Sequence, residues 1–491
     1  MMNLTKQRAY EAYRTRDSAF DGILYIGISS TGIYCRPICP ARRAKIDNCT
    51  FFESPAAAEL AGFRPCLRCH PERASFSDAH KSSHSLAERV ASILWTHAST
   101  GITIEKIASD LGYSSRHIRR VFEQAYHVTP VYYAETCHLL LAKALLQDST
   151  LSILDVSMAA GFGSTRRMNE LFQTRYGMTP TSLRKCSEPS LIAGTISLHL
   201  PYRPPYILDR ILTFLKNRAI SGVENVQKNT YTRTVSLTGR KGKAYTGTIQ
   251  VTKSPHEHAL LVTLTDTLLP VLSQVLSRVC HQFDVSADPA TIANTLCVMN
   301  KTYANTFIEG IRIPRAFDPF ETTVRAILGQ QISIKAANTL AARFVQALGT
   351  PFASQETQLT HLFPTPEEIL SHETDLPSIL GPLGIIASRT ESILSIARAL
   401  HDHTLSLDGK KNYDETIHTL LSIKGIGPWT AQYIAMRVLG EPDIFMENDG
   451  GIKKAMPHTT AKERLSIAED WRPFRRAMPP SACGSKRKEI L

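Results

Sequence analysis

The chain of 491 residues is too long for a single hydrophobic core, and roughly 150 residues per domain predicts three or four domains. Its 56 lysine and arginine residues exceed its 44 aspartate and glutamate residues, so the formal net charge is +12 and a polyanionic partner is favoured. No apolar run is long enough to span a membrane and residues 1–18 lack the apolar core of a signal peptide, so we expect a cytoplasmic protein with no membrane partner, whose cysteines are thiols or metal ligands.

Two closely spaced cysteine pairs stand out in the first 75 residues. Cys35 and Cys39 form a C-x3-C pair, and Cys66 and Cys69 form a C-x2-C pair. Four thiolates at this spacing suit tetrahedral zinc, which can hold together a domain that would hardly fold otherwise. The pattern therefore predicts a small zinc-bound domain over residues 1–75.

The segments FDGILYIGISSTGIYCRPICPARRAKIDNCTFF and AAGFRPCLRCHPE, which carry these pairs, resemble the N-terminal domain of Ada-type proteins over roughly residues 8–72. The resemblance implies an α+β domain that moves the methyl group of a DNA methylphosphotriester onto a zinc-bound cysteine. Cys35, the first ligand, matches the acceptor position. One zinc ion would be structural and would also keep the thiol deprotonated, and the thiolate is the nucleophile. Methylation removes a negative charge, so DNA affinity should rise.

Two similar helical hairpins follow a polar, serine-rich stretch over residues 71–85, which is expected to be a linker. In each hairpin one helix, over residues 104–111 or 154–160, ends at glycine, and the next begins at Ser114 or Ser164, residues typical of helix N-caps. Each second helix carries basic residues on its first turns, where a recognition helix meets bases and phosphates. These residues are Arg116, Arg119, Arg120, Arg166 and Arg167.

The two hairpins are joined by an apolar helix and closed by Tyr176-Gly177-Met178-Thr179-Pro180. This arrangement resembles an AraC-type DNA-binding domain, here over residues 84–187. The resemblance implies an all-α tandem helix-turn-helix domain that binds promoter sites in double-stranded DNA. If the protein is an activator, RNA polymerase is an expected partner.

Residues 194–305 have a mixed strand and helix pattern, unlike the helical segment before them. Runs rich in Thr, Val and Leu predict strands over residues 195–200, 230–237, 245–251 and 259–264, and apolar periodicity predicts helices over 207–219 and 268–283, so this part is an α+β module. The strings LPYRPPYILDRILTFLKNRAISGVE and YTRTVSL resemble the N-terminal domain of the 3-methyladenine DNA glycosylase II family. Phe214 matches a pocket-lining aromatic residue of that family.

Residues 306–491 are expected to be all-α. Ile423-Lys424-Gly425-Ile426-Gly427 breaks one apolar helical pattern and a second starts at Trp429, so the glycines lie in a hairpin where backbone N–H groups can approach a phosphate. The string IKGIGPWTAQYIAMR, followed about twenty residues on by Asp449, resembles the helix-hairpin-helix glycosylases, and most of all the inducible 3-methyladenine DNA glycosylase II family. Asp449 before two glycines is also a common helix N-cap.

The resemblance implies roles for residues around this hairpin. Trp429 and Tyr433, one helical turn apart, would line a base pocket, because electron-rich rings attract cationic alkylated purines. Asp449 would stabilise an oxocarbenium-like sugar and orient or deprotonate water, with no cofactor. Glycosylases with lyase activity carry lysine where Trp429 stands, so monofunctional hydrolysis is expected. Lys424, with Gly425 and Gly427, would meet phosphate.

The segment over residues 320–348 resembles the part of the family that supplies the duplex wedge. Gln330 matches a polar contact position at the base pocket, and Gln331 matches the wedge itself. From Arg476 onward the chain departs from the family: two prolines and a basic tail replace an apolar helix that carries another pocket aromatic. That departure could leave the glycosylase part unstable or inactive.

Together these patterns predict a mainly α, multidomain repair protein of the bacterial cytoplasm, associated with the nucleoid. It would excise alkylated purines such as 3-methyladenine from damaged DNA and also act as a methylphosphotriester-sensing transcription regulator. The alternative is a methyl-activated transcription factor of the alkylation response whose glycosylase domain is degenerate. A non-catalytic DNA-binding scaffold would require both Asp449 and Cys35 to be incidental.

Overall fold

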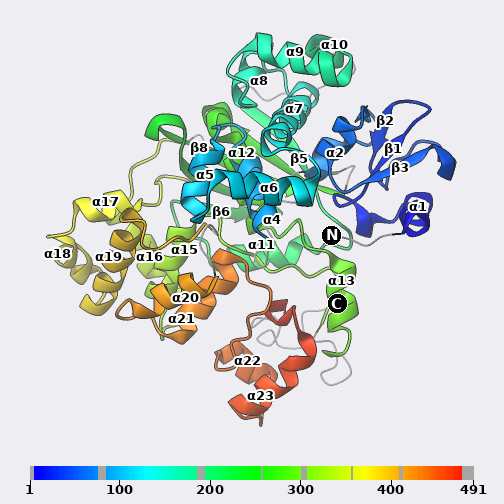
Figure 1. The fold of residues 1–491 in the computed structure, drawn as a ribbon. Helices are drawn as coiled ribbons and strands as arrows, with labels where there is room; N and C mark the ends of the chain where they lie inside the picture. The colour runs from blue at the N-terminus through cyan, green and yellow to red at the C-terminus, as the bar shows by residue number, and fades with distance from the viewer. Residues whose placement is uncertain are drawn as a thin grey trace. The chain divides into compact units, whose positions relative to one another are not determined.

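The computed structural model describes residues 5–75, 85–184, 194–255, 258–299, 307–354, 358–408 and 413–477 (Figure 1). The chain divides into two compact units. Unit one contains residues 1–80, 84–204 and 235–280, and unit two contains residues 81–83, 205–234 and 281–491. Within the described residues, no helix is both long and apolar enough to cross a membrane.

The N-terminal part of unit one is a four-stranded sheet with short helices. The strand order is β3-β1-β2-β4, antiparallel except for the parallel pair β2 and β4. This α+β arrangement agrees with the prediction for the zinc domain. Its elements are α1 (Lys6–Thr15), β1 (Tyr25–Ile28), β2 (Ile33–Cys35), β3 (Cys49–Phe52), α2 (Pro55–Leu60), β4 (Arg64–Pro65) and α3 (Pro71–Ser75).

Seven helices over residues 86–184 form the tandem hairpins. The side chains of Ser114 and Ser164 accept hydrogen bonds from backbone N–H groups and cap α6 and α9, as their sequence positions predict. Gly112 ends α5 in the left-handed conformation, with φ of 73°. The helices are α4 (Leu86–Thr96), α5 (Ile104–Leu111), α6 (Ser115–Tyr126), α7 (Pro130–Asp148), α8 (Ile153–Ala159), α9 (Thr165–Tyr176) and α10 (Pro180–Arg184).

Within unit one, buried carboxylates of the zinc domain bind side chains of these helices. Glu59 of α2 accepts hydrogen bonds from the hydroxyl groups of Thr136 and Tyr176, both at 3.0 Å. Glu72 forms an ion pair with Lys143 of α7, and both side chains are at most 1% exposed. Residues 71–75 were expected to belong to a linker; they instead form α3, because Glu72 has a buried partner.

The second sheet has the order β5-β9-β8-β7-β6. Its strands are β5 (Thr195–Pro201), β6 (Glu224–Gln227), β7 (Thr230–Thr238), β8 (Ala244–Lys253) and β9 (Ala259–Thr265). The four predicted strands agree with β5, β7, β8 and β9 to within two residues at each end. The helix predicted over residues 207–219 is α11 (Leu208–Lys216), and the one over 268–283 is the 3-10 segment Asp266–Val271 followed by α12 (Leu272–Gln282).

The remainder of unit two is helical where it is described, as predicted. One large apolar core lies among α15 (Pro319–Leu328), α16 (Ile334–Leu348), α17 (Pro366–Ser371), α18 (Leu376–Leu380), α19 (Ala387–His401), α20 (Tyr413–Ser422) and α21 (Pro428–Ile434). The helices α13 (Pro289–Leu296), α22 (Gly450–Ala455) and α23 (Ala461–Ala468) contribute to a second apolar cluster. Helix α21 continues as a π-helical turn, Ala435–Leu439.

The described end of the chain packs against unit two. Arg475 forms an ion pair with Asp443 at 2.5 Å. The backbone N–H of Arg476 donates to the carbonyl of Pro442 at 3.1 Å, and its buried guanidinium lies 3.7 Å from Asp284. The atypical tail is therefore anchored as far as Ala477, and its remainder, residues 478–491, lies outside the described residues.

Candidate functional sites

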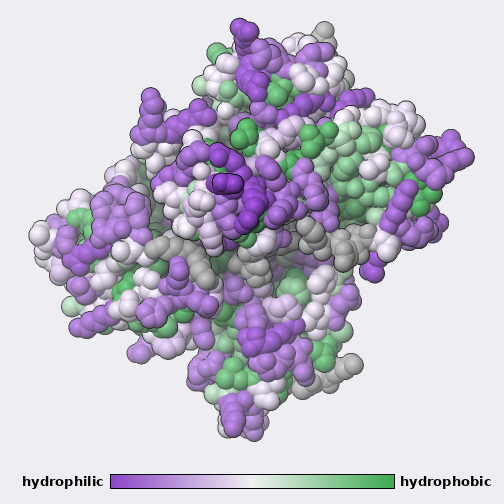
Figure 2. Space-filling model, in the orientation of Figure 1, coloured by the Kyte–Doolittle hydropathy of each residue, from purple (hydrophilic) through white to green (hydrophobic). Residues whose placement is uncertain are grey.

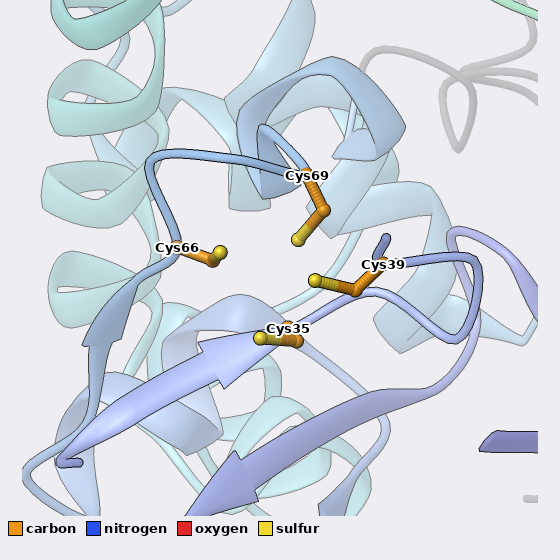
Figure 3. A group of neighbouring side chains, drawn as sticks. All are labelled: Cys35, Cys39, Cys66 and Cys69. Atoms are coloured by element: carbon orange, nitrogen blue, oxygen red, sulfur yellow. The ribbon is translucent and has the colours of Figure 1, made fainter. Parts of the chain in front are cut away.

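The four predicted zinc ligands come together in one cluster. Cys35 ends β2, Cys66 follows β4, and Cys39 and Cys69 lie in the turns after them. Their sulfur atoms lie within 4.8 Å of one another and point into a common space (Figure 3). Four sulfurs bound to one zinc ion at about 2.3 Å would lie about 3.8 Å apart, so the cluster fits a tetrahedral site.

Hydrogen-bond donors surround these sulfurs. The backbone N–H of Arg36 donates to Sγ of Cys69 at 3.3 Å, and that of Arg68 donates to Sγ of Cys66 at 3.4 Å. Such donors stabilise negative sulfur, which is the form that binds a metal and acts as a nucleophile.

Exposure does not single out one cysteine as the methyl acceptor. The exposed fractions of Cys35, Cys39, Cys66 and Cys69 are 3%, 1%, 5% and 6%. The guanidinium of Arg36 is buried and ion-paired with Asp21. The acceptor role of Cys35 therefore still depends on the family resemblance.

The five arginines predicted to bind DNA are all exposed on α6 and α9, as expected for recognition helices. Arg119 pairs with Glu105 at 2.7 Å, Arg166 with Glu170 at 3.0 Å and Arg167 with Glu135 at 2.5 Å. Exposed pairs contribute only about 0–1 kcal/mol, so phosphate can replace these carboxylates at little cost. The surface over α5 and α6 is mainly hydrophilic (Figure 2). The two remaining residues are Arg116 and Arg120.

The glycine hairpin joins α20 to α21. Gly425 has φ of 88°, and a Cβ atom built there would lie 2.2 Å from Oγ of Ser392. That hydroxyl also donates to the carbonyl of Lys424 at 2.9 Å, which fixes the turn. Gly427 is the N-cap of α21, and a Cβ atom there would meet no atom within 4 Å. Lys424 is exposed. The hairpin is thus built as predicted, and Gly425 is the position that requires glycine.

The predicted wedge loop is tied to this hairpin. The side-chain amide of Gln330 donates to the carbonyl of Gly425 at 2.9 Å and to Oγ1 of Thr430 at 3.0 Å. Gln331 is exposed with φ of 58°, in the left-handed region. Gln330 thus supports the hairpin in this structure, while Gln331 projects from the loop beside it.

The predicted pocket aromatics lie in unit two with two arginines that the sequence analysis missed. The rings of Trp429 and Tyr433 stack, with centroids 5.3 Å apart and an interplanar angle of 14°. The Cζ atoms of Arg218 and Arg437 lie 3.9 Å and 4.5 Å from the centroid of Phe214. Each arginine stands four residues after a predicted pocket aromatic, a spacing of about one helical turn that could have signalled both, and Arg218 lies just past the end of α11.

Asp449 caps α22, because its carboxylate accepts a hydrogen bond from the backbone N–H of Gly451 at 2.7 Å. Its side chain is half-buried, and its charge acts on both missed arginines. Burial lowers the pKa of Arg218 and of Arg437, and in both cases Asp449 opposes that shift. The carboxylate is thus a helix cap and also an electrostatic neighbour of the cations beside Phe214.

Family models match four consecutive parts of the chain. They are the metal binding domain of Ada over residues 8–72, a helix-turn-helix domain over 107–185, the AlkA N-terminal domain over 197–318, and the HhH-GPD superfamily of base excision DNA repair proteins over 324–468. These matches confirm the resemblances drawn from the sequence. With the cysteine cluster, the first match supports one Zn2+ at that site.

Two relatives in sequence agree with these matches. A Mycobacterium tuberculosis protein named probable bifunctional transcriptional activator/DNA repair enzyme AlkA is 32% identical over 96% of this chain and 94% of its own length. DNA-3-methyladenine glycosylase 2 of Escherichia coli is 31% identical over 56% of this chain and 93% of its own. The solved 3-methyladenine DNA-glycosylase from Archaeoglobus fulgidus is 21% identical, covers 57% of this chain and 94% of its own, and has a TM-score of 0.48.

Proposed function

Because the chain belongs to the family of bifunctional Ada/AlkA-type DNA repair enzymes and transcriptional activators, we propose that its glycosylase part hydrolyses the N-glycosidic bond of alkylated purines such as 3-methyladenine and leaves an abasic site. The observation that carries this proposal is the glycine hairpin, which Gln330 binds and which leads directly into the helix that carries the stacked rings of Trp429 and Tyr433. Excision of an extruded base requires aromatic rings that receive the base.

In the proposed reaction the target nucleotide leaves the duplex, and the exposed Gln331 fills the gap. The hairpin around Gly425 holds the backbone through its N–H groups, with Lys424 near phosphate. An alkylated purine carries positive charge, so it departs without a strong general acid. Asp449 then stabilises the oxocarbenium-like sugar and accepts a proton from the attacking water. Trp429 occupies the position of a lyase lysine, so the sugar–phosphate chain is not cut.

The second activity is a single methyl transfer in the zinc domain. The thiolate of Cys35 attacks the methyl carbon of a methylphosphotriester, a C–S bond forms, the C–O bond breaks, and an ordinary phosphodiester leaves. The zinc ion supplies thiolate character when bound. Conversion of a thiolate to a thioether removes one negative charge, so the domain should then hold DNA more tightly.

The third role is promoter recognition by α6 and α9, with RNA polymerase as the partner of an activator. The exposed arginines of both helices, such as Arg116 and Arg166, would contact phosphates or base edges. Tandem recognition helices on one central helix suit successive segments of one DNA face.

One experiment separates the two chemical activities. The zinc-loaded full chain is incubated with DNA treated with a methylating agent, free bases are measured by chromatography, and protein methylation is mapped by mass spectrometry. We expect released methylpurine and one added methyl group on Cys35. A Cys35→Ala chain should still release base. Methylation of the parent chain without base release would instead favour the second candidate, a regulator whose altered sequence after Arg475 has inactivated the glycosylase.

A further inference from the structure

The wedge loop, residues 329–333 between α15 and α16, has few contacts that would fix its position from within. Residues 331–336 are all exposed, and the apolar side chains of Ile332 and Ile334 are 36% and 49% exposed. Gln331 has φ of 58°, a left-handed conformation that costs energy for most residues other than glycine. Such a conformation persists only where the surrounding structure holds it. The position of Gln331 therefore depends on contacts made from outside the loop.

Arg389, near the start of α19, makes one of these contacts. Its guanidinium donates a hydrogen bond to the backbone carbonyl of Gln330. That carbonyl belongs to the planar peptide unit between Gln330 and Gln331, and rotation of this unit about the N–Cα bond of Gln331 is the φ angle of Gln331. The hydrogen bond from Arg389 therefore holds the strained angle directly. Among the described residues, the guanidinium of Arg389 has no other acceptor and no carboxylate partner.

The first two turns of α19 also hold the glycine hairpin. Oγ of Ser392, three residues after Arg389, donates to the carbonyl of Lys424 at 2.9 Å. The side-chain amide of Gln330 connects the wedge loop to the same hairpin through the carbonyl of Gly425, also at 2.9 Å. Helix α19, the wedge loop and the hairpin are thus joined by side-chain hydrogen bonds within unit two.

We propose that Arg389 is a positioning residue for base extrusion, because it holds Gln331 in the conformation that enters the duplex, in register with the hairpin that binds the DNA backbone. This inference rests on the proposed glycosylase function. A wedge that is already ordered in the free protein loses less conformational entropy when it fills the gap left by the nucleotide. Arg389 acts through Gln331 and not through the base or the sugar.

Insertion of the wedge can be measured without base release. One duplex carries tetrahydrofuran, an abasic-site analogue, beside 2-aminopurine, whose fluorescence rises when its stacking is disturbed, and a second duplex is undamaged. The proteins are the parent full chain, Arg389→Met, Gln331→Ala, the double variant and the control Arg343→Met. Arg343 is an exposed arginine of α16 that donates to the carbonyl of Leu383 at 3.0 Å. Its replacement removes the same charge and the same kind of hydrogen bond outside the wedge loop.

We expect Arg389→Met to lower the ratio of the affinity for the tetrahydrofuran duplex to that for undamaged duplex about tenfold, which corresponds to about 1.4 kcal/mol. The fluorescence rise should fall with it, and Arg343→Met should change neither. In Arg389→Met, the affinity for undamaged duplex and its salt dependence should stay those of the parent. Arg389→Met should add little to Gln331→Ala in the double variant, because coupled residues are not additive.

The possible contrary results differ in what they overturn. An unchanged affinity ratio and fluorescence rise in Arg389→Met, or full additivity in the double variant, would overturn this inference alone. A slope of log affinity against log salt that is lower by about 0.9 in Arg389→Met would also overturn it, since Arg389 would then bind a phosphate. A parent chain that gives no fluorescence rise on the tetrahydrofuran duplex would overturn the inference together with the proposed function.

Discussion

Replacement of Lys143 by methionine should lower the stability of unit one more than the removal of any charge on its surface. Lys143 and Glu72 form an ion pair between the zinc domain and α7 (Pro130–Asp148), with side chains 0% and 1% exposed. Methionine has a similar volume, so the main consequence is a buried carboxylate without its ammonium partner. Only His70, whose Nδ1 lies 3.1 Å from Glu72, would remain. Breaking a buried pair in this way typically costs about 3–5 kcal/mol.

The pKa of Glu72 gives an independent magnitude. Burial raises this pKa, but Lys143 and His70 outweigh burial and lower it from 4.5 to about 2. A pKa lowered from 4.5 to about 2 corresponds to roughly 3 kcal/mol of stability. Because the folded-state pKa is depressed, this stability is fully present above about pH 4.5 and is lost as the pH falls toward 2. In the Lys143→Met chain the pKa of Glu72 loses this depression, so the substitution should cost most near pH 7 and least at low pH, where Glu72 is neutral.

Hydrogen exchange read by mass spectrometry on peptides of α7 gives the free energy of opening of unit one. The surface control is Lys106→Met, which removes a pair with Asp110 whose lysine is 64% exposed, and it should cost at most about 1 kcal/mol. The double change Glu72→Gln with Lys143→Met should recover much of the loss, since it leaves no unpaired charge. A cost below about 1 kcal/mol for Lys143→Met at pH 7 would refute this reasoning.

Three further predictions use matched variants. Gly425→Ala, with φ of 88° and a clash at 2.2 Å, should weaken binding to undamaged duplex in anisotropy titrations, whereas Gly381→Ala, outside the hairpin and with no atom within 4 Å of its Cβ, should not; equal losses would contradict the hairpin account. Cys69→Ser should lose bound zinc in a chelator assay, and Cys49→Ser, which changes a buried cysteine outside the cluster, should retain it. Arg167→Ala should reduce the slope of log affinity against log salt by about 0.9, and an unchanged slope would exclude phosphate contact.

Local signals in the sequence predicted the elements that depend on local chemistry. Ser114 and Ser164 cap the recognition helices because a hydroxyl at that position satisfies a free N–H group wherever the helix lies. The strand Glu224–Gln227 was missed because its polar sequence has no apolar alternation, and it is fixed by pairing with β7.

Long-range contacts within each unit were beyond local signals. In the sequence, Lys143 is a single lysine within an apolar helical segment, and no pattern near it predicts that Glu72 is its partner. Cys35 and its fellow ligands were found because metal spacing is itself a local pattern. The stacking of Arg218 on Phe214 depends on side-chain packing at the end of α11, so the sequence suggested an open aromatic face instead.

The central claim is that Asp449 carries base excision, and single-turnover release of base from methylated duplex tests it most directly. Asparagine also caps helices, so Asp449→Asn retains the cap of α22 and removes only the charge. We predict release by the parent chain, a loss of about a hundredfold or more in Asp449→Asn, and no change in Asp470→Asn, an exposed aspartate elsewhere in unit two. Equal rates in the parent and Asp449→Asn, or no release by folded, zinc-loaded parent chain, would contradict the account.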